Sequence, residues 1–407
     1  MAGIIVIGAG QAGVAAAARL RAKGHDGPLT VIGDEPVPPY QRPPLSKDYL
    51  KGTMPLDRLL LRNDAFYAEN GITLRLGTPV TGIDRAAQTV GLGDEHLRYD
   101  HLILTTGSLP RRLPATMGGD LAGIHVVRTL ADIDAMAPDF APDRRVLIVG
   151  GGYIGLEAAA VAAGKGLTTT LVEAAPRILQ RVAAPEVSDY FRALHRAHGV
   201  EIIEGVGLER LTGAGRVTGA VLADGREVTA DFVILGIGIL PATALAEAAG
   251  LTIDNGIAVD RHGRTSDPAI WAAGDCASFP WQGGRLRLEN VQNAIDQAEC
   301  VADNILGAGR DYAPEPWFWS DQYDAKLQIA GLSAGYDDIT PRPGPPPEPG
   351  KAPQASFWYF RQGGLIAVDA INDGRAYLVG KRLIAAGKTP DRAALADPAT
   401  DLKSLLA

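Results

Sequence analysis

The chain has 407 residues, more than one hydrophobic core usually supports, so we expect two or three domains. Apolar residues make up 46% of it, as in ordinary globular proteins, and no uncharged apolar run reaches the roughly 18 residues that would span a bilayer. The net charge of −8 argues against nucleic acid as a partner. The first apolar run leaves no room for a signal peptide, and Cys276 and Cys300 fit no metal-ligand spacing. We therefore expect a cytoplasmic protein with no metal site and no membrane segment.

The formal charge is unevenly spread along the chain. Residues 1–108 contain 11 basic and 11 acidic side chains and residues 314–407 contain 10 and 11, whereas residues 109–313 contain 18 and 25. The two ends of the chain are therefore the better docking surface for an acidic protein partner.

The start of the chain predicts a dinucleotide-binding unit. An apolar run suited to a buried parallel strand is followed by an alanine-rich helical pattern. Between them lie three glycines in G-x-G-x-x-G spacing, Gly8, Gly10 and Gly13. The first permits a tight turn, the second lets the backbone approach a pyrophosphate, and the third lets the helix pack on its strand. The next strand, Leu29–Ile32, is followed by Asp34-Glu35, and we expect Asp34, with Glu35 as the alternative, to bind a ribose.

The same pattern recurs in the middle of the chain. An apolar strand at Val146–Val149 leads into a second set of glycines with the same spacing, Gly150, Gly152 and Gly155. The next strand ends in Glu173, whose carboxylate can accept both ribose hydroxyls and would repel a 2′-phosphate, so we expect NADH rather than NADPH. Because one nicotinamide coenzyme needs only one such turn, we expect the first turn to hold FAD.

A proline-rich segment, Pro36–Lys47, follows the first ribose strand. Its prolines predict an extended path without helix, after which Ser46 could cap a short helix. Arg42 and Lys47 make the segment positively charged, so it could line a flavin. The alternative is a surface loop with solvated side chains.

Short strands follow in the first domain. The expected strands are Ile72–Leu76, Val80–Ile83, Thr89–Leu92 and Leu102–Thr105. The last ends in Thr106-Gly107, where a nucleotide domain would close on its cofactor. Arg128 and a helix near Leu130–Met136 then lead into the second domain.

Further strands complete the second domain, and we expect them at Glu201–Ile203, Val217–Leu222 and Phe232–Leu235. After them, backbone exposed at Gly238 could approach the nicotinamide. Residues 242–313 return to the first domain, where a strand ends in Gly274-Asp275. Such an aspartate suits a ribityl hydroxyl, although an ordinary strand-end acid is the alternative. Asn290 then begins a helix whose dipole would stabilise an anionic reduced flavin.

Residues 314–407 have a different texture. The aromatic stretch Trp317–Tyr323 is typical of interface core, and the alternative is that Trp319 abuts the flavin. Pro341–Gly350 predicts a stiff loop without internal hydrogen bonds. The remaining elements expected here are strands at Leu327–Ile329, Phe357–Phe360 and Leu365–Ile371 and helices at Arg375–Ala386 and Pro390–Leu395.

Together these motifs resemble the FAD-dependent NADH:ferredoxin reductases of cytochrome P450 and ring-hydroxylating dioxygenase systems, putidaredoxin reductase among them, and more distantly apoptosis-inducing factor. The resemblance covers essentially the whole chain, and its discriminating elements are Pro43-Pro-Leu-Ser-Lys47 and Pro316-Trp-Phe-Trp-Ser320. It implies an α/β fold with two Rossmann-like dinucleotide-binding domains, as in glutathione reductase, and a C-terminal α+β domain. The implied boundaries are 1–108 with 242–313 for FAD, 109–241 for NADH, and 314–407.

The resemblance also implies roles for individual residues. Lys47 would lie beside flavin N5 and pair with Glu157, and Trp319 would lie between the flavin and a docked ferredoxin. The positions that contact FAD in this family correspond to Ala12, Asp34, Lys47, Val80, Arg128, Asp275 and Val291, and those that hold NADH to Gly152, Ile154, Glu173 and Gly238. Two features depart from the family. The 341–350 loop is longer than expected, and Glu299 stands where putidaredoxin reductase has a partner-binding arginine.

The implied function is transfer of electrons from NADH through FAD, one at a time, to an acidic [2Fe-2S] ferredoxin that binds transiently to a monomer or weak dimer. Relatives that reduce disulfides carry cysteines over the flavin, whereas Tyr40–Leu50, the corresponding segment, has none. A rubredoxin reductase or NADH oxidase, and a redox sensor like apoptosis-inducing factor, are the alternatives. A basic patch for the ferredoxin is expected at Lys381, Arg382 and Lys388, with a solvated helix face as the alternative.

Overall fold

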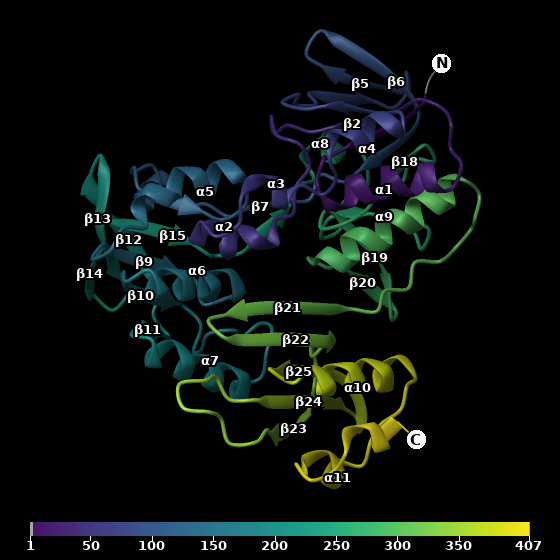
Figure 1. Ribbon diagram of the computed structural model, residues 1–407. Helices are drawn as coiled ribbons and strands as arrows, with labels where there is room; N and C mark the ends of the chain where they lie inside the picture. The colour runs from purple at the N-terminus through teal and green to yellow at the C-terminus, as the bar shows by residue number, and fades with distance from the viewer. Residues whose placement is uncertain (1–2, 407) are drawn as a thin grey trace. The chain divides into compact units, whose positions relative to one another are not determined.

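A computed structural model describes residues 3–406 of the chain (Figure 1). Its contacts divide the chain into two compact units. The first unit takes in the chain up to Arg42 together with Pro55–Leu109 and Ile239–Pro316, and the second takes in Pro43–Met54, Pro110–Gly238 and the chain from Trp317 onward. The three-domain division expected from the sequence stays a prediction.

The first unit is built on a seven-stranded sheet in the order β3-β2-β1-β6-β5-β4, with β18 paired to β6. The strands around the first glycine turn run parallel, and the hairpin β4–β5 extends the sheet antiparallel. The strands are β1 (Gly3–Ile7), β2 (Leu29–Ile32), β3 (Ile72–Arg75), β4 (Gly82–Asp84), β5 (Thr89–Leu92), β6 (Glu95–Leu104) and β18 (Ile270–Ala272). The predicted strand at 80–83 therefore begins only at Gly82, and Val80 lies in the loop before it.

Two helices pack side by side on this sheet, α1 (Gln11–Ala22) and α9 (Val291–Ile305) (Figure 1). Their apolar faces share one buried cluster with the strands, in which Ile4, Leu20, Ile103, Trp271 and Val301 take part. The segment after residue 239 thus contributes to the core around the first glycine turn. The shorter elements of this unit are α3 (Leu56–Leu59), α4 (Asp64–Glu69), β7 (Ser108–Pro110), β16 (Ile239–Pro241), α8 (Ala244–Ala248), β17 (Ile257–Ala258), β19 (Ala277–Trp281) and β20 (Gly284–Leu286).

The second unit contains a parallel five-stranded sheet in the order β11-β10-β9-β15-β8. Its strands are β8 (Ile124–Val126), β9 (Arg145–Val149), β10 (Thr168–Glu173), β11 (Glu201–Glu204) and β15 (Phe232–Leu235). Helix α6 (Tyr153–Gly164) follows β9 across the second glycine turn. An antiparallel sheet, β12 (Leu208–Ala214), β13 (Arg216–Leu222) and β14 (Glu227–Thr229), accompanies it. Helix α7 (Pro185–Ala197) was not predicted from the sequence.

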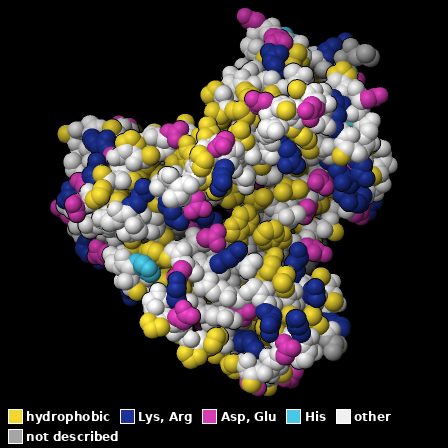
Figure 2. All heavy atoms as spheres, viewed as in Figure 1, with side chains coloured by type: hydrophobic (Ala, Val, Ile, Leu, Met, Phe, Trp, Pro, Cys, Tyr) yellow, Lys and Arg dark blue, Asp and Glu magenta, His cyan; other side chains and the backbone are white. Residues whose placement is uncertain are grey.

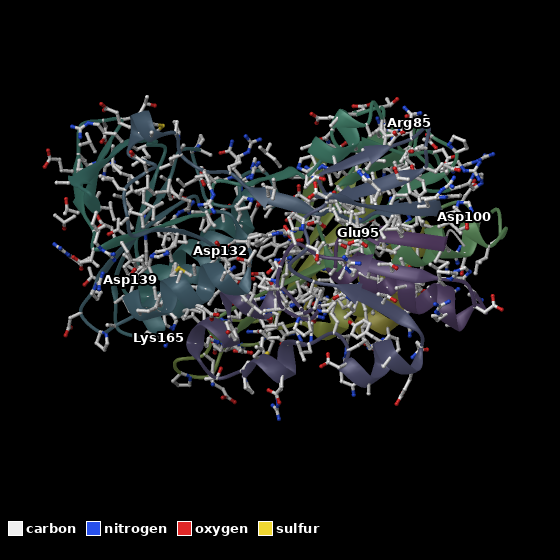
Figure 3. All side chains as sticks on the ribbon, turned by 90° about the horizontal axis from the view of Figure 1, so that it is seen from above. Arg85, Glu95, Asp100, Asp132, Asp139 and Lys165 are labelled. Carbon is white, nitrogen blue, oxygen red and sulfur yellow. The ribbon has the colours of Figure 1, made fainter. Side chains whose placement is uncertain are left out.

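Charged side chains fix the frame of this unit, and Figure 3 labels two of them, Asp132 and Asp139. Asp132 and Thr129 form a capping box at the start of α5 (Leu130–Met136), which satisfies two backbone donors. Asp139 pairs with His125 of β8, Arg144 before β9 and Arg216 of β13, all within 2.9 Å. The segment that leads into β9 is therefore tied through Asp139 to β8 and β13.

The end of the chain forms an antiparallel five-stranded sheet in the order β21-β22-β25-β24-β23. Helix α10 (Gly374–Ala385) packs on it, with Trp358, Val368 and Leu383 in the shared core. The strands are β21 (Trp317–Gln322), β22 (Ala325–Gly331), β23 (Asp338–Pro343), β24 (Ala355–Arg361) and β25 (Gly364–Ile371). Helix α11 (Arg392–Ala396) and a final 3₁₀ turn at Leu402–Leu406 complete it.

Two expectations about the proline-rich segments were wrong. Pro341–Pro343 belongs to β23, which tolerates proline because it is an edge strand, and Arg342 donates to the carbonyls of residues 395, 397, 398 and 400. Pro43–Ser46 forms a 3₁₀ turn instead of an extended path. The cap position of the following helix, α2 (Asp48–Lys51), is Lys47, and Ser46 donates its hydrogen bond elsewhere.

Across residues 3–406, no helix is both long and apolar enough to cross a membrane. The same described residues contain no group of three or more histidine, cysteine or acidic side chains that could hold a metal ion.

Candidate active site

The second glycine turn combines two positions that only glycine can occupy with one that faces open space. A Cβ on Gly150, whose φ is +109°, would lie 2.3 Å from the Gly236 carbonyl oxygen, and a Cβ on Gly155 would lie 2.0 Å from that of Gly150. A Cβ on Gly152 would meet no atom of the described residues within 4 Å. The first and last glycines thus let helix and strand pack, and the middle one leaves room for a pyrophosphate at the N-terminus of α6. The turn fits a dinucleotide.

Glu173, at the end of β10, is oriented into this turn by two backbone amides. Its Oε2 accepts a hydrogen bond from Gly151 N over 2.6 Å and its Oε1 accepts one from Ala175 N over 2.7 Å. Each carboxylate oxygen can accept a second hydrogen bond, so the group is held in place and still able to receive ribose hydroxyls. Ile154, at the start of α6, is 43% exposed, and Gly238 has a φ of +95°.

The first glycine turn has the same construction. A Cβ on Gly8, whose φ is +114°, would lie 2.2 Å from the Thr105 carbonyl oxygen, and one on Gly13 would lie 2.0 Å from that of Gly8. A Cβ on Gly10 would find no atom of the described residues within 4 Å. Ala12 is buried against Gly274, whose own Cβ would approach the Ala12 Cβ to 3.1 Å. This cradle fits the pyrophosphate of FAD at the N-terminus of α1.

Asp34 and Glu35, the acidic pair after β2, differ in their contacts. Glu35 accepts hydrogen bonds from the Tyr40 hydroxyl and from Arg42 Nη2, both over 2.6 Å. Asp34 is exposed at the end of the strand. The arrangement therefore engages Glu35 within the protein and presents Asp34 outward, as expected of a ribose ligand. Arg42 is tied to the strand end by Glu35 and is not a solvated loop cation.

The remaining FAD candidates of the first unit gather at the carboxyl ends of β6 and β18. Asp275 accepts a hydrogen bond from the Ser108 hydroxyl over 2.9 Å, and Thr106 donates to the Ala242 carbonyl oxygen. Gly274 N donates to Gln297 Oε1 of α9, whose buried Nε2 has no partner among the described residues. A buried amide without an acceptor calls for a polar partner, which a bound cofactor can supply. Of the other candidates, Gly107 follows β6, Val291 is the first residue of α9, and Val80 lies apart in the loop before β4.

The second unit brings Lys47, Glu157 and Trp319 together from three separate segments. Lys47 Nζ lies 3.2 Å from Glu157 Oε1 and 3.6 Å from Asp321 Oδ2. The same ammonium lies 5.6 Å from the centre of the Trp319 ring, within the range of a cation–π contact. Arg128 also belongs to this unit. The ion pair that the resemblance implied is present, and the catalytic roles of its members stay predictions.

Two serines complete this cluster, and the sequence did not predict them as site residues. Ser46 donates to Glu157 Oε2 over 2.5 Å, and Ser320 donates to Glu157 Oε1 over 2.7 Å. Glu157 is 3% exposed, and its burial raises the pKa of the carboxyl while Lys47 and the two serines oppose the rise. Each serine directly adjoins a predicted residue, Lys47 or Trp319, and that adjacency was the only signal available.

Both cysteines of the chain are free thiols in the first unit, buried among backbone groups. Burial raises the pKa of the Cys276 thiol and that of the Cys300 thiol, which disfavours the thiolate that disulfide exchange requires.

Comparison with known proteins gives two family matches along the chain. Residues 2–298 match the pyridine nucleotide-disulphide oxidoreductase family, and residues 317–406 match the reductase C-terminal family. Rhodocoxin reductase of Rhodococcus erythropolis is 42% identical and putidaredoxin reductase CamA of Pseudomonas putida is 41% identical; each alignment covers 99% of this chain and 94% or 96% of the relative. The putidaredoxin reductase of a covalent complex with putidaredoxin matches the whole chain with a TM-score of 0.94 at 39% identity, over 98% of that protein. The chain therefore belongs to the pyridine nucleotide-disulphide oxidoreductase family and is a flavin- and nicotinamide-dependent reductase with the reductase C-terminal domain.

Proposed function

We propose that this chain is an NADH:ferredoxin reductase that passes electrons one at a time to a [2Fe-2S] ferredoxin serving a cytochrome P450 or a ring-hydroxylating dioxygenase. The observation that carries the proposal is the Lys47–Glu157 ion pair beside Trp319, in a chain whose only two thiols are buried. Relatives support the acceptor class, since they include a reductase for rhodocoxin, one for putidaredoxin, and the ferredoxin reductase subunit of 5,5′-dehydrodivanillate O-demethylase.

FAD, when bound, supplies the chemistry, because it accepts a hydride from a nicotinamide and gives electrons up singly. The chain's own residues bind and orient. Gly10 and Gly152 leave space for the two pyrophosphates, and Asp34 and Glu173 accept ribose hydroxyls in this proposal. We assign Asp275, Thr106, Gly107, Gly274, Val80, Val291, Arg42 and Arg128 to FAD, and Ile154 and Gly238 to the coenzyme.

Lys47 and Glu157 act on charge. Glu157 and Asp321 face the Lys47 ammonium, and we propose that this ammonium stabilises charge during hydride transfer. Glu157 in turn is held by Ser46 and Ser320, which fixes the direction in which the Lys47 side chain points. The pair orients and stabilises charge without needing to transfer a proton.

We propose α10 and the Trp319 strand as the surface that receives the ferredoxin. Figure 2 shows basic side chains over the part of the surface that α10 forms. Arg382 and Lys388 are exposed, Lys381 is half-buried, and Leu378, one turn before Arg382, is 56% exposed. Basic side chains near an exposed apolar side chain suit an acidic, transient partner. A solvated helix face remains the competing interpretation of these basic residues.

NADH is the coenzyme we propose. Glu173 has its carboxylate aimed at the second glycine turn by Gly151 N and Ala175 N, and a negative charge there disfavours a 2′-phosphate. The expected cytoplasmic location and the expected monomer or weak dimer stay predictions.

The acceptor is tested by presenting three of them to the NADH-reduced enzyme: a [2Fe-2S] ferredoxin, a rubredoxin and O₂. The proposal expects fast oxidation by the ferredoxin and slow oxidation by O₂. Fast oxidation by rubredoxin alone would support the second candidate, which a 38% identical rubredoxin reductase of Pseudomonas putida favours. Fast reaction with O₂ alone would make the chain an NADH oxidase, and NADH-driven dimerisation without an acceptor would make it a redox sensor.

A further inference from the structure

Glu157 lies at one end of a buried series of hydrogen bonds that the reaction as described does not use. Ser320, which donates to Glu157, accepts a hydrogen bond from Gln322 Nε2 over 3.2 Å. Gln322 Oε1 lies 2.8 Å from His195 Nε2, and His195 Nδ1 lies 3.3 Å from the Tyr323 hydroxyl. Ser320, Gln322 and His195 are each 0% exposed. Side chains from β21 and α7 thus form one continuous polar path to the carboxylate.

The two polar residues on β21 occupy positions that a strand normally fills with apolar side chains. Because successive residues of a strand face opposite sides, Ser320 and Gln322 share the buried face while Trp319 and Asp321 share the half-buried face towards Lys47. Burying an amide and a hydroxyl costs free energy unless their hydrogen bonds are made. Both are made here, to each other and to Glu157 and His195.

The charge of Glu157 fixes the direction of every bond in the series. A carboxylate only accepts, so Ser320 must donate to it, and the Ser320 oxygen is then the acceptor for the Gln322 amide. Gln322 Oε1 therefore faces His195 as an acceptor, which requires the proton on His195 Nε2. His195 Nδ1, left without a proton in the neutral ring, accepts from the Tyr323 hydroxyl. All four donors point towards Glu157.

We propose that Ser320, Gln322 and His195 form a positioning chain that keeps the Glu157 carboxylate ionised and thereby holds the Lys47 ammonium in place. The aligned donors oppose the burial that would otherwise protonate Glu157, since hydrogen bonds made in series polarise one another. His195 must remain neutral to serve in this way. Its burial lowers the pKa of the imidazole to about 4, an effect that the charge of His198 reinforces and the Gln322 hydrogen bond opposes. This inference rests on the charge-stabilising role that we propose for Lys47 and Glu157.

Other titratable groups face the two ends of this positioning chain, at Glu157 and at Tyr323. At the Glu157 end they are Lys47, Asp321 and Tyr153, which lie in the segment before α2, in β21 and in α6. At the far end His198 stacks on Tyr323 with ring centres 3.7 Å apart. Burial raises the pKa of Tyr323 and that of Tyr153, so both hydroxyls keep their protons across the working range.

Four variants of the FAD-loaded enzyme test the proposed positioning chain. Gln322→Met removes the central amide, and Ser320→Ala removes only the last donor and disturbs packing least. Ser320→Thr keeps the hydroxyl. Ser188→Ala is the matched control, because Ser188 lies on α7 like His195 and is also 0% exposed. Its hydroxyl donates a hydrogen bond to the Ile178 carbonyl oxygen, which is not part of the positioning chain.

Three measurements are compared across these variants: the tautomer of His195 by ¹⁵N-histidine NMR, the titration of Glu157 by ¹³C-carboxyl NMR with Glu157→Gln as the assignment, and the pH dependence of flavin reduction by NADH. We expect His195 to be neutral with its proton on Nε2 from pH 5.5 to 8.5. Gln322→Met and Ser320→Ala should raise the Glu157 midpoint and the acid limb of the rate profile by roughly one pH unit. Ser320→Thr and Ser188→Ala should match the wild type.

Three results would overturn the proposed positioning chain. They are a proton on His195 Nδ1, a His195 titration near its ordinary value, and unchanged Glu157 titration in Gln322→Met and Ser320→Ala. An equal change in Ser188→Ala would do the same, because it would trace the effect to packing of α7. None of the three measurements involves ferredoxin, so a failure to reduce ferredoxin would contradict the proposed acceptor without contradicting the positioning chain. If NADH did not reduce the flavin, the two NMR measurements would still show whether the positioning chain holds Glu157 ionised.

Discussion

Lys47 and Glu157 form an ion pair with 3.2 Å between Nζ and Oε1, although Glu157 is 3% exposed and Lys47 12% exposed at its side chain. Such a pair is costly to bury and is maintained only when every partner is in place. Ser46, Ser320 and Asp321 supply the remaining contacts. The cluster is therefore one unit of charge and hydrogen bonds, and removing any member should be felt by the others.

Replacing Lys47 tests the pair directly. Lys47→Met should leave Glu157 buried without a cation, raise its pKa further and lower the rate of flavin reduction by NADH by roughly tenfold or more. The free energy of unfolding should fall by roughly 3–5 kcal/mol, since a buried charge loses its partner. Stopped-flow absorbance and urea unfolding measure the two effects. Lys51→Met, on the exposed side of α2, is the control, and a Lys47→Met rate within twofold of wild type would dismiss the role of the pair.

The middle glycine of the second turn offers a test without a steric complication. Gly152 has φ −81° and ψ 179°, which alanine adopts freely, and a Cβ there meets nothing of the described protein within 4 Å. Gly152→Ala should therefore preserve the fold and the FAD content but raise the KM for NADH by roughly tenfold, because the methyl group occupies the space of the pyrophosphate. Gly164→Ala, at the end of the same helix and equally unobstructed, should leave the KM unchanged. Equal KM values in the two variants would place the coenzyme elsewhere.

Coenzyme preference is set by Glu173 in this account. Glu173→Ala should lower kcat/KM for NADH by roughly tenfold to a hundredfold, because a charged acceptor of ribose hydroxyls is lost. Adding Ala174→Arg should raise kcat/KM for NADPH, since Ala174 is exposed at the strand end and a guanidinium there can meet a 2′-phosphate. Steady-state assays with both coenzymes measure the ratio, with exposed Glu209→Ala as the control. A wild type that already prefers NADPH would contradict the assignment.

The buried carboxyl of Asp369 makes stability depend on pH. Burial raises its pKa to about 7, and the Tyr359 hydroxyl that it accepts from opposes the rise. The native state then binds a proton that the unfolded chain releases near pH 4, so stability falls as pH rises from about 4 to 7 and levels off above. Asp369→Asn should abolish this fall and gain on the order of 3 kcal/mol over wild type at pH 8. Thermal unfolding from pH 5 to 9 measures both proteins; parallel curves would show that Asp369 is ionised in the fold.

Local sequence was sufficient for the two glycine turns and for the strands that frame them. A Cβ on Gly13 or Gly155 would strike the backbone of Gly8 or Gly150, so this constraint acts within one strand–turn–helix and can be predicted from consecutive residues. Glu173 is likewise readable, because the end of the second strand always lies beside the turn. The resemblance to known reductases added the Lys47–Glu157 pairing, which no spacing within the chain would reveal.

The residues around Glu157 could not be predicted locally. Ser46, Ser320, Gln322 and His195 come from three elements that meet only in the folded second unit. Ser46 is a residue type that often caps helices, and it stands where a cap is expected. Its hydroxyl instead donates to the Glu157 carboxylate, which lies far away in the sequence. Pro341–Pro343 was assigned to a loop because proline lacks a donor, and the sequence does not state that this strand lies at the edge of its sheet. In both cases the partner that decides the structure lies far away along the chain.

The most direct test of the account is the stoichiometry of anaerobic turnover by the yellow, FAD-loaded protein, with NADH as donor and a [2Fe-2S] ferredoxin as acceptor. We predict two ferredoxins reduced for each NADH oxidised, with neither Cys276 nor Cys300 becoming open to alkylation during turnover. A protein that cannot be loaded with FAD, a ferredoxin that stays oxidised, or a thiol that is alkylated only when NADH is present would contradict it.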